Sequence, residues 1–248
     1  MATIVEMINP LTGLPEQVDK LDHTAQEIDD AVGLAPQISN PNLLDNWYFG
    51  NPVNQRGQTE YTAEGYTIDR WSIGSGATLT LTNGSLYISA GNLITYLESG
   101  SNLFSKTVTF SMLTQSGLVS GTARLGDSYA VWDATSLYNG VAFQYRSNDV
   151  FALLISKGMF LSGAIAVKLE LGSQQTLAHQ NADGNWVLNE IPDYGEQLAR
   201  CQRYFQTFAT ESLRPTNALD FRPVMRATPA LSTITVGGKT LYTASADL

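Results

Sequence analysis

Aromatic side chains are the residues of this sequence with the clearest capacity to bind a ligand. One group lies within 25 residues near the start of a β-rich region: Trp47, Tyr48, Phe49, Tyr61, Tyr66 and Trp71. A second group is spread further along the chain: Tyr129, Trp132, Tyr138, Tyr145 and Trp186. The C–H groups of a pyranose ring pack on the π face of an exposed Trp or Tyr, and neighbouring amides and charged groups can bind its hydroxyls. These residue types therefore predict a glycan-binding surface.

Burial in the core or in a subunit interface is the alternative role for each ring. Trp71 follows Asp69 and Arg70 in an alternating, strand-like segment, so we expect it in the core. Trp132 and Tyr138 flank a predicted loop and should be exposed. The candidate glycan site is accordingly assigned to Trp132, Tyr138, Tyr145 and Trp186.

Motifs for histidine, nucleotide and metal chemistry give little support to an enzyme. His23 and His179 are the two histidines, neither has a Cys or a second His close by, and no Gly-x-Ser-x-Gly elbow is present. Phosphate-binding, dinucleotide-binding and His-Glu-x-x-His motifs are absent too. Segment 181–185 resembles part of a calcium loop, but it lacks the downstream bidentate Glu. We therefore predict no metal site and no cofactor.

Paired carboxylates are the remaining catalytic candidates, because two of them flanking a glycosidic bond can hydrolyse it. Glu60 with Glu64, and Glu190 with Asp193 and Glu196, form such groups. An acidic chain of this size offers similar pairs by chance, so we interpret them as solvated surface charge. No catalytic residue is predicted, and the chain is expected not to be an enzyme.

Composition excludes several kinds of partner. Lys and Arg number 14 against 23 Asp and Glu, which gives a net charge of -9. Nucleic acid and anionic membrane surfaces both require a basic footprint, so neither is an expected partner. Cys201 is the single cysteine; it permits no disulfide framework and should be a buried core residue.

The balance of polar residues indicates an exterior protein. Only 15% of the residues are charged, and Thr, Ser, Asn and Gly provide the polar surface instead. That profile is common in extracellular and virion-exposed β proteins. The sequence contains no run of 18 apolar residues, so we expect no transmembrane helix. The N-terminal residues do not resemble a signal peptide. A virion part released by cell lysis would reconcile these features.

A narrow heptad repeat near the N-terminus predicts self-association. Its apolar positions alternate in steps of three and four: Leu11, Leu14, Val18, Leu21, Ala25, Ile28 and Val32. This is the a/d seam of a coiled coil, and Pro15 and Gly33 suit the start and the end of a helix. We expect these seven residues to be oligomerisation contacts. Docking of an amphipathic helix on its own subunit is the alternative, and the seam does not fix the number of strands.

Short alternating segments then predict a mainly β fold. Segment 78–89 alternates on both sides of Asn83-Gly84 and predicts a type I′ hairpin with Leu79, Leu81, Leu86 and Ile88 facing the core. Further strands are expected at 93–98, 107–113, 118–124, 128–133, 140–146, 150–155 and 163–171. Their number and spacing favour a β-sandwich, in particular a jelly roll.

The remaining chain is predicted to be a loop, a helix and short strands. Segment 174–192 is predicted to be a loop, and the spacing of the apolar residues in 194–208 predicts a helix. Strands are expected at 218–225, 232–236 and 240–243, with Gly237-Gly238 turning the last hairpin. The expected domains are thus an anchor and coiled-coil stalk over 1–36, a jelly-roll β-sandwich over 42–172, and a C-terminal helix and β segment over 173–248.

Several longer motifs resemble tail-fibre and related appendage proteins of phages and prophages. They are segment 42–49 (NLLDNWYF), segment 54–57 (NQRG), segment 66–71 (YTIDRW), segment 166–172 (AVKLELG), segment 196–205 (EQLARCQRYF) and segment 223–229 (PVMRATP). The resemblance covers about residues 42–230. It implies a carbohydrate-binding-module-like jelly roll, a homotrimer and display on the exterior of a virion. It supplies no defined ligand site.

The expected function is that of a virion structural fibre protein of a tailed phage, either a tail fibre or a head fibre. The N-terminus would attach to other virion proteins of the baseplate, tail or capsid. The trimeric head would bind host cell-surface glycan for attachment. A non-binding structural decoration is the leading alternative, and a glycan depolymerase is a further one.

Overall fold

The computed structural model describes residues 4–8, 15–19, 39–126, 136–138, 140–147 and 149–247. The chain divides into two compact units, Met1–Gln37 and Ile38–Leu248. In the first unit, β1 (Ile4–Ile8) and β2 (Pro15–Asp19) form an antiparallel pair that aligns Val5 with Val18.

The predicted stalk helix is wrong for Pro15–Asp19, because this segment is a strand. Ile4, Val5 and Ile8 favour extended backbone, and pairing with β1 outweighs the helical spacing of so short a segment. Val18 is therefore a strand residue. The other seam residues, Leu11, Leu14, Leu21, Ala25, Ile28 and Val32, lie outside the described residues, so the coiled coil stays a prediction there.

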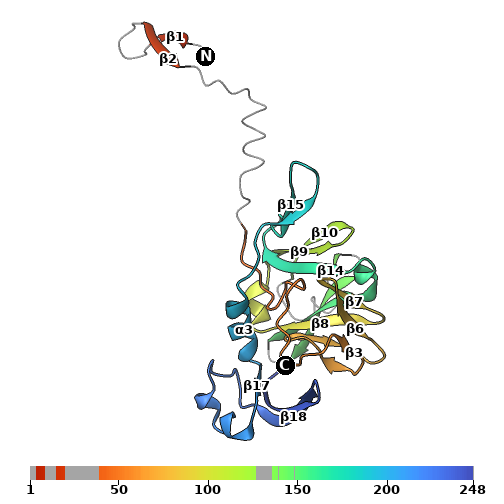
Figure 1. The fold of residues 1–248 in the computed structure, drawn as a ribbon. Helices are drawn as coiled ribbons and strands as arrows, with labels where there is room; N and C mark the ends of the chain where they lie inside the picture. The colour runs from red at the N-terminus through yellow and green to blue at the C-terminus, as the bar shows by residue number, and fades with distance from the viewer. Residues whose placement is uncertain are drawn as a thin grey trace. The chain divides into compact units, whose positions relative to one another are not determined.

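Two six-stranded antiparallel sheets form the main body of the second unit (Figure 1). The first sheet has the order β10 (Gly117–Arg124), β9 (Thr107–Thr114), β14 (Ala164–Leu171), β7 (Ser85–Ile88), β6 (Leu79–Thr82) and β3 (Glu60–Tyr61). The second has the order β11 (Ser136–Tyr138), β12 (Val141–Ser147), β13 (Val150–Ser156), β8 (Asn92–Leu97), β5 (Trp71–Ile73) and β4 (Gly65–Tyr66). The mainly β fold is thus confirmed.

One hydrophobic cluster joins the two sheets into a sandwich. Phe110 and Leu169 enter it from the first sheet, and Trp71 and Phe151 enter it from the second; all four are fully buried. The expected core position of Trp71 is confirmed, and its indole Nε1 donates a hydrogen bond to the Asn46 carbonyl at 2.9 Å. Burial of such large rings on both inner faces is a main source of sandwich stability.

The β6–β7 hairpin forms as its sequence predicts. Leu79 pairs with Ile88, and Leu81 pairs with Leu86. Asn83 and Gly84 both have positive φ values, 50° and 69°, as a type I′ turn requires. Leu79 and Leu86 are fully buried, whereas Leu81 is partly buried against the same core.

Segment 42–49 extends the first sheet along the part of the β14 edge that β7 leaves uncovered, since β7 pairs with β14 at Ala164 alone. Leu43 N–H donates to the Leu169 carbonyl, Phe49 N–H donates to the Ile165 carbonyl, and Val167 N–H donates to the Trp47 carbonyl. This added segment explains why β14 is buried along almost its whole length. Strand 128–133, predicted from sequence, lies outside the described residues.

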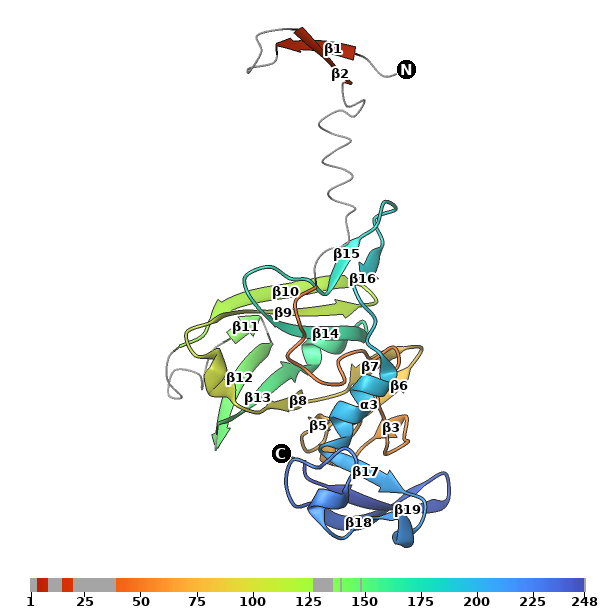
Figure 2. The same cartoon turned by 90° about the vertical axis from the view of Figure 1, so that its left-hand side faces the viewer.

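The C-terminal part begins with a short hairpin, β15 (Ala178–Gln180) and β16 (Trp186–Leu188), where the sequence predicted a loop. Helix α3 (Tyr194–Gln202) follows and leads from the sandwich to a three-stranded sheet (Figure 2). That sheet contains β17 (Phe205–Phe208), β19 (Lys239–Ser245) and β18 (Ala230–Val236). Short 3-10 turns occur at Gly100–Leu103, Lys157–Phe160, Glu211–Leu213 and Ala218–Asp220.

Two C-terminal predictions are wrong, and one is confirmed. The helix ends at Gln202 rather than near Phe208, because Phe205–Phe208 pairs with β19. The strand expected at 218–225 is replaced by a 3-10 turn and by Phe221, which packs in a small second core. The hairpin at Gly237-Gly238 forms as expected between β18 and β19.

Candidate functional site

A shallow groove beside Trp186 combines an exposed aromatic ring with uncharged polar groups. It has a volume of about 320 Å³ and lies between the β9–β10 turn and the β15–β16 hairpin. We call it the Trp186 groove; its lining is Leu113, Thr114, Gln115, Ser116, Gly117, Ile165, Gly184, Asn185 and Trp186. None of these residues carries a formal charge.

Local sequence chemistry forms the turn that presents Trp186. The Asn181 side-chain oxygen accepts hydrogen bonds from the Asp183 and Asn185 backbone N–H groups, at 3.1 and 2.9 Å. Gly184 adopts a φ of +78°, which a residue with a side chain rarely does. This segment is therefore a polar turn in the structure, and Trp186 opens the strand that leaves it.

A second glycine lets the opposite turn approach the indole. Gly117 has a φ of +126°, and a Cβ there would lie 3.4 Å from Trp186 Nε1. Thr114 supports the same turn, because its hydroxyl donates to the Gly117 carbonyl at 2.9 Å. Trp186 nevertheless keeps 37% of its surface exposed. An indole that is anchored on one side and open on the other suits the stacking of a flat, partly apolar ligand.

Hydrogen-bonding groups surround the exposed ring. The Gln115 side chain is held in place by donating to Ser85 Oγ at 2.8 Å, and its carbonyl oxygen is a further acceptor. Ser116 and Asn185 add a hydroxyl and an amide to the lining. Uncharged donors and acceptors beside an open indole can bind the hydroxyl groups and the C–H face of a sugar.

Two of the other predicted glycan residues belong to strands of the second sheet, whereas the strands that line this groove include β9, β10 and β14 of the first. Tyr138 belongs to β11, and Tyr145 belongs to β12 in the second sheet. The Tyr145 ring packs against Phe151 with 5.5 Å between centroids and is partly buried against the core. Trp132 lies outside the described residues.

The candidate acid–base residues have structural partners. His179 Nδ1 is hydrogen-bonded to Asn189 Oδ1. Asp193 caps α3 by accepting a hydrogen bond from the Glu196 N–H at 2.8 Å. Glu190 lies 3.6 Å from Lys168 Nζ. His179, Asp193 and Glu190 thus each have a partner within the described part of the chain.

A buried ionic cluster is the feature that sequence reasoning missed. Asp69 is 1% exposed and accepts two hydrogen bonds from Gln55, at 2.7 and 2.8 Å. Arg56 bonds to Asp247 at 2.7 Å, and its guanidinium lies 3.7 Å from the centroid of the Phe205 ring. Segments 54–57, 66–71 and 196–205 therefore meet in space. The cluster fastens the C-terminal sheet to the sandwich.

Burial dominates the electrostatics of this cluster. It raises the pKa of Asp69 to about 6, although Arg56 and the hydrogen bonds from Gln55 act in the opposite direction. It raises the pKa of Asp247 as well. It also raises the pKa of the Cys201 thiol, and the predicted burial of that side chain is confirmed.

Comparison with known proteins identifies no relative: no protein-family model, curated protein or solved structure matches the chain. Within the described residues, no three or more His, Cys, Asp and Glu side chains gather as metal ligands do. No described helix is both long enough and apolar enough to cross a membrane.

Proposed function

We propose that this chain is a virion structural fibre protein of a tailed phage whose β-sandwich binds a host-surface glycan at the Trp186 groove. The observation that carries the proposal is the half-open indole of Trp186, in a groove whose described lining includes amides and hydroxyls but no charged side chain. Neutral sugar rings require this combination of an apolar face and uncharged hydrogen-bonding groups.

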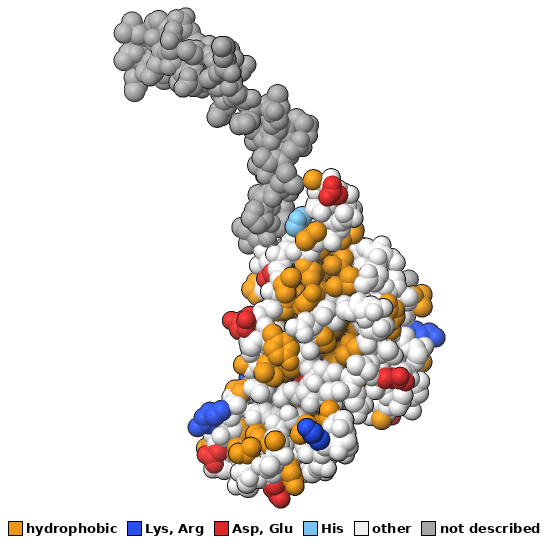
Figure 3. All heavy atoms as spheres, viewed as in Figure 1, with side chains coloured by type: hydrophobic (Ala, Val, Ile, Leu, Met, Phe, Trp, Pro, Cys, Tyr) orange, Lys and Arg blue, Asp and Glu red, His pale blue; other side chains and the backbone are white. Residues whose placement is uncertain are grey.

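The character of the surface supports an exterior, glycan-facing role. Charged side chains are sparse on the face shown in Figure 3, where apolar side chains gather over the sandwich beneath the β15–β16 hairpin. The phage-like motifs supply the remaining elements of the proposal. These are a carbohydrate-binding-module-like jelly roll, a homotrimer, and attachment to other virion proteins through the N-terminus.

Trimerisation would make a weak groove useful. An open groove with one stacking ring leaves much of a sugar in water, so one copy should bind weakly. Three linked copies can raise effective affinity by about 10²–10⁴-fold when the geometry allows simultaneous binding.

A glycan array probed with the full chain tests the binding role. We expect Trp186→Ala to weaken binding by about tenfold or more, which corresponds to about 1.4 kcal/mol. Val187→Ala is the matched control, because Val187 is the next residue of β16, is 42% exposed and does not line the groove. Equal binding by both variants would remove the groove from the proposal. Absence of glycan binding by the unaltered chain would favour a purely structural decoration.

Light scattering of the full chain tests the assembly. A trimer should have a mass near three times 26.9 kDa. The double change Leu21→Asp and Ile28→Asp should split it if the heptad seam holds the copies together. A monomeric unaltered chain would contradict the trimer, and an unchanged mass of the variant would show that other contacts assemble it.

A further inference from the structure

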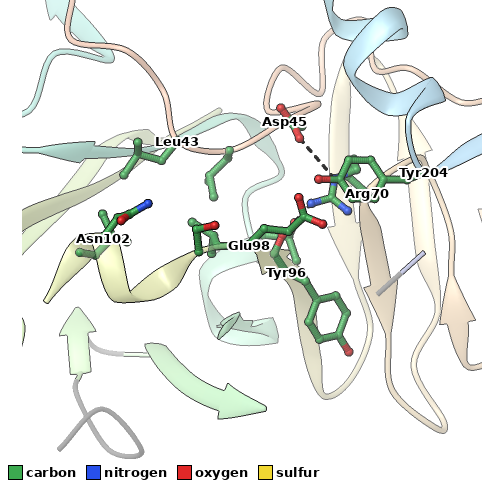
Figure 4. A pocket seen from close by; sticks show the side chains of 12 residues that line it. Leu43, Asp45, Arg70, Tyr96, Glu98, Asn102 and Tyr204 are labelled. Carbon is green, nitrogen blue, oxygen red and sulfur yellow. Dashed lines mark hydrogen bonds and ion pairs between the residues drawn. The ribbon is translucent and has the colours of Figure 1, made fainter. Parts of the chain in front are cut away.

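A second, more enclosed pocket is built around Arg70. It has a volume of about 260 Å³. We call it the Arg70 pocket, and its lining is Leu43, Leu44, Asp45, Arg70, Thr95, Tyr96, Leu97, Glu98, Ser99, Asn102, Leu103 and Tyr204. Figure 4 shows Arg70 between Asp45 and Tyr204 on one side of the pocket, with Leu43 and Asn102 on the other. It shares no residue with the Trp186 groove.

Arg70 has hydrogen-bonding capacity that the described chain does not use. Its side chain is 4% exposed, and its guanidinium lies 3.5 Å from the centroid of the Tyr204 ring. Nη2 donates to the Tyr96 carbonyl at 2.7 Å. Nε and Nη1 have no hydrogen-bond partner among the described residues, although Nε lies 3.4 Å from an Asp45 carboxylate oxygen. Buried donors without partners are costly, so a ligand oxygen that reached them would bind favourably.

Two carboxylates set the charge that such a ligand can carry. Asp45 and Glu98 both line the pocket. Glu98 accepts a hydrogen bond from Arg226, and this contact lowers the Glu98 pKa even though burial alone would raise it. Glu98 and Asp45 are therefore acceptors beside the donor Arg70. An anion would face both carboxylates, and a cation would compete with Arg70 for Asp45 or with Arg226 for Glu98.

Hydroxyl groups fit this arrangement, because each can accept from a guanidinium and donate to a carboxylate at the same time. The Asn102 amide and the Ser99 hydroxyl offer further bonds, while Leu43 and Leu103 provide apolar wall. The volume is below the usual range of about 300–1,000 Å³ for drug-sized ligands, which favours one sugar ring over an oligosaccharide.

We infer that the Arg70 pocket binds a single uncharged sugar residue, separately from the Trp186 groove. The choice of a glycan as the ligand class rests on the proposed function. The pocket itself rests on Arg70 and its neighbours.

Saturation-transfer NMR with the full chain and individual sugars tests this inference. The probes are glucose, galactose and N-acetylglucosamine, with glucuronic acid and glucosamine as charged comparisons. At least one neutral sugar should bind, and Asn102→Ala and Glu98→Gln should each weaken it about tenfold or more. Val187→Ala, at an exposed residue that lines neither the pocket nor the groove, should leave it unchanged. Arg70→Lys should also weaken it, and thermal melting would show whether that variant is folded; Asn102 is exposed and carries the test if it is not.

The inference is overturned if no neutral sugar binds, if a charged sugar binds in preference, or if the pocket variants bind as the unaltered chain does. Loss of monosaccharide binding on Trp186→Ala alone would likewise assign the sugar to the groove and refute the pocket. If single sugars fail but the array signal depends on Trp186, the pocket inference fails and the proposed function stands. If neither assay detects binding, both fail.

Discussion

Asp69→Asn should remove a pH dependence of stability that the buried cluster creates. Burial raises the pKa of Asp69 from an ordinary value of 3.8 to about 6, so the folded protein holds a proton that the unfolded chain has released. Stability from this group is therefore present at low pH and is lost as the pH rises through about 6. At about 1.4 kcal/mol per pKa unit, the whole effect is about 3 kcal/mol.

Urea unfolding at pH 5 and pH 7 measures the part of this stability change that occurs between the two pH values. Integration between these two values predicts a free energy of unfolding about 1.3 kcal/mol larger at pH 5, from Asp69 alone. Asp247, whose pKa burial also raises, should add in the same direction. Glu98 changes stability in the opposite direction as the pH rises, but its pKa is lowered from 4.5, so that change occurs below pH 5.

The difference between the unaltered chain and the variant isolates Asp69. Asp69→Asn is expected to be less stable at both pH values, since an amide nitrogen would face one of the two donors of Gln55. Its pH dependence should nevertheless be smaller by about 1.3 kcal/mol. Asp183→Asn, in an exposed turn, is the matched control and should keep the slope of the unaltered chain. Equal slopes for the unaltered chain and Asp69→Asn would refute the reasoning.

Two further substitutions test the packing of the sandwich. Gly100→Ala should destabilise the protein by about 1–3 kcal/mol, because the new Cβ would lie 1.8 Å from a ring carbon of buried Phe151; Gly74→Ala, with nothing within 4 Å, should change the melting temperature little. Lys168→Ala should lower the free energy of unfolding, measured with denaturant, by about 3–5 kcal/mol, because it leaves the buried carboxylate of Glu170 without its cation. Glu190→Ala is the comparison: Glu190 is 42% exposed, so its loss should lower the free energy of unfolding by under about 1 kcal/mol. Equal losses for the two variants would show that the buried pair stabilises the fold no more than an exposed one.

Strand positions could be predicted from sequence wherever the alternation of apolar and polar residues matches the buried and exposed faces of the folded strand. The β6–β7 hairpin is such a case, since alternation fixes its inner face and Asn83-Gly84 fixes its turn. The predicted glycan residues show the limit of this reasoning. Trp186 is partly exposed beside polar groups, but Tyr145 packs against Phe151. A tyrosine in a strand has the same local pattern in either setting, so the sequence could not separate the two roles.

The sequence by itself determined the class of fold, the buried position of Trp71 and the last hairpin, because these follow from side-chain period and turn chemistry over a few residues. Only the tertiary structure decided that Phe205–Phe208 is a strand, since its partner β19 comes much later in the chain. The same holds for the stacking of Arg70 on Tyr204. Contacts between residues so distant in sequence leave no periodic pattern, and they arise only when the whole sandwich closes.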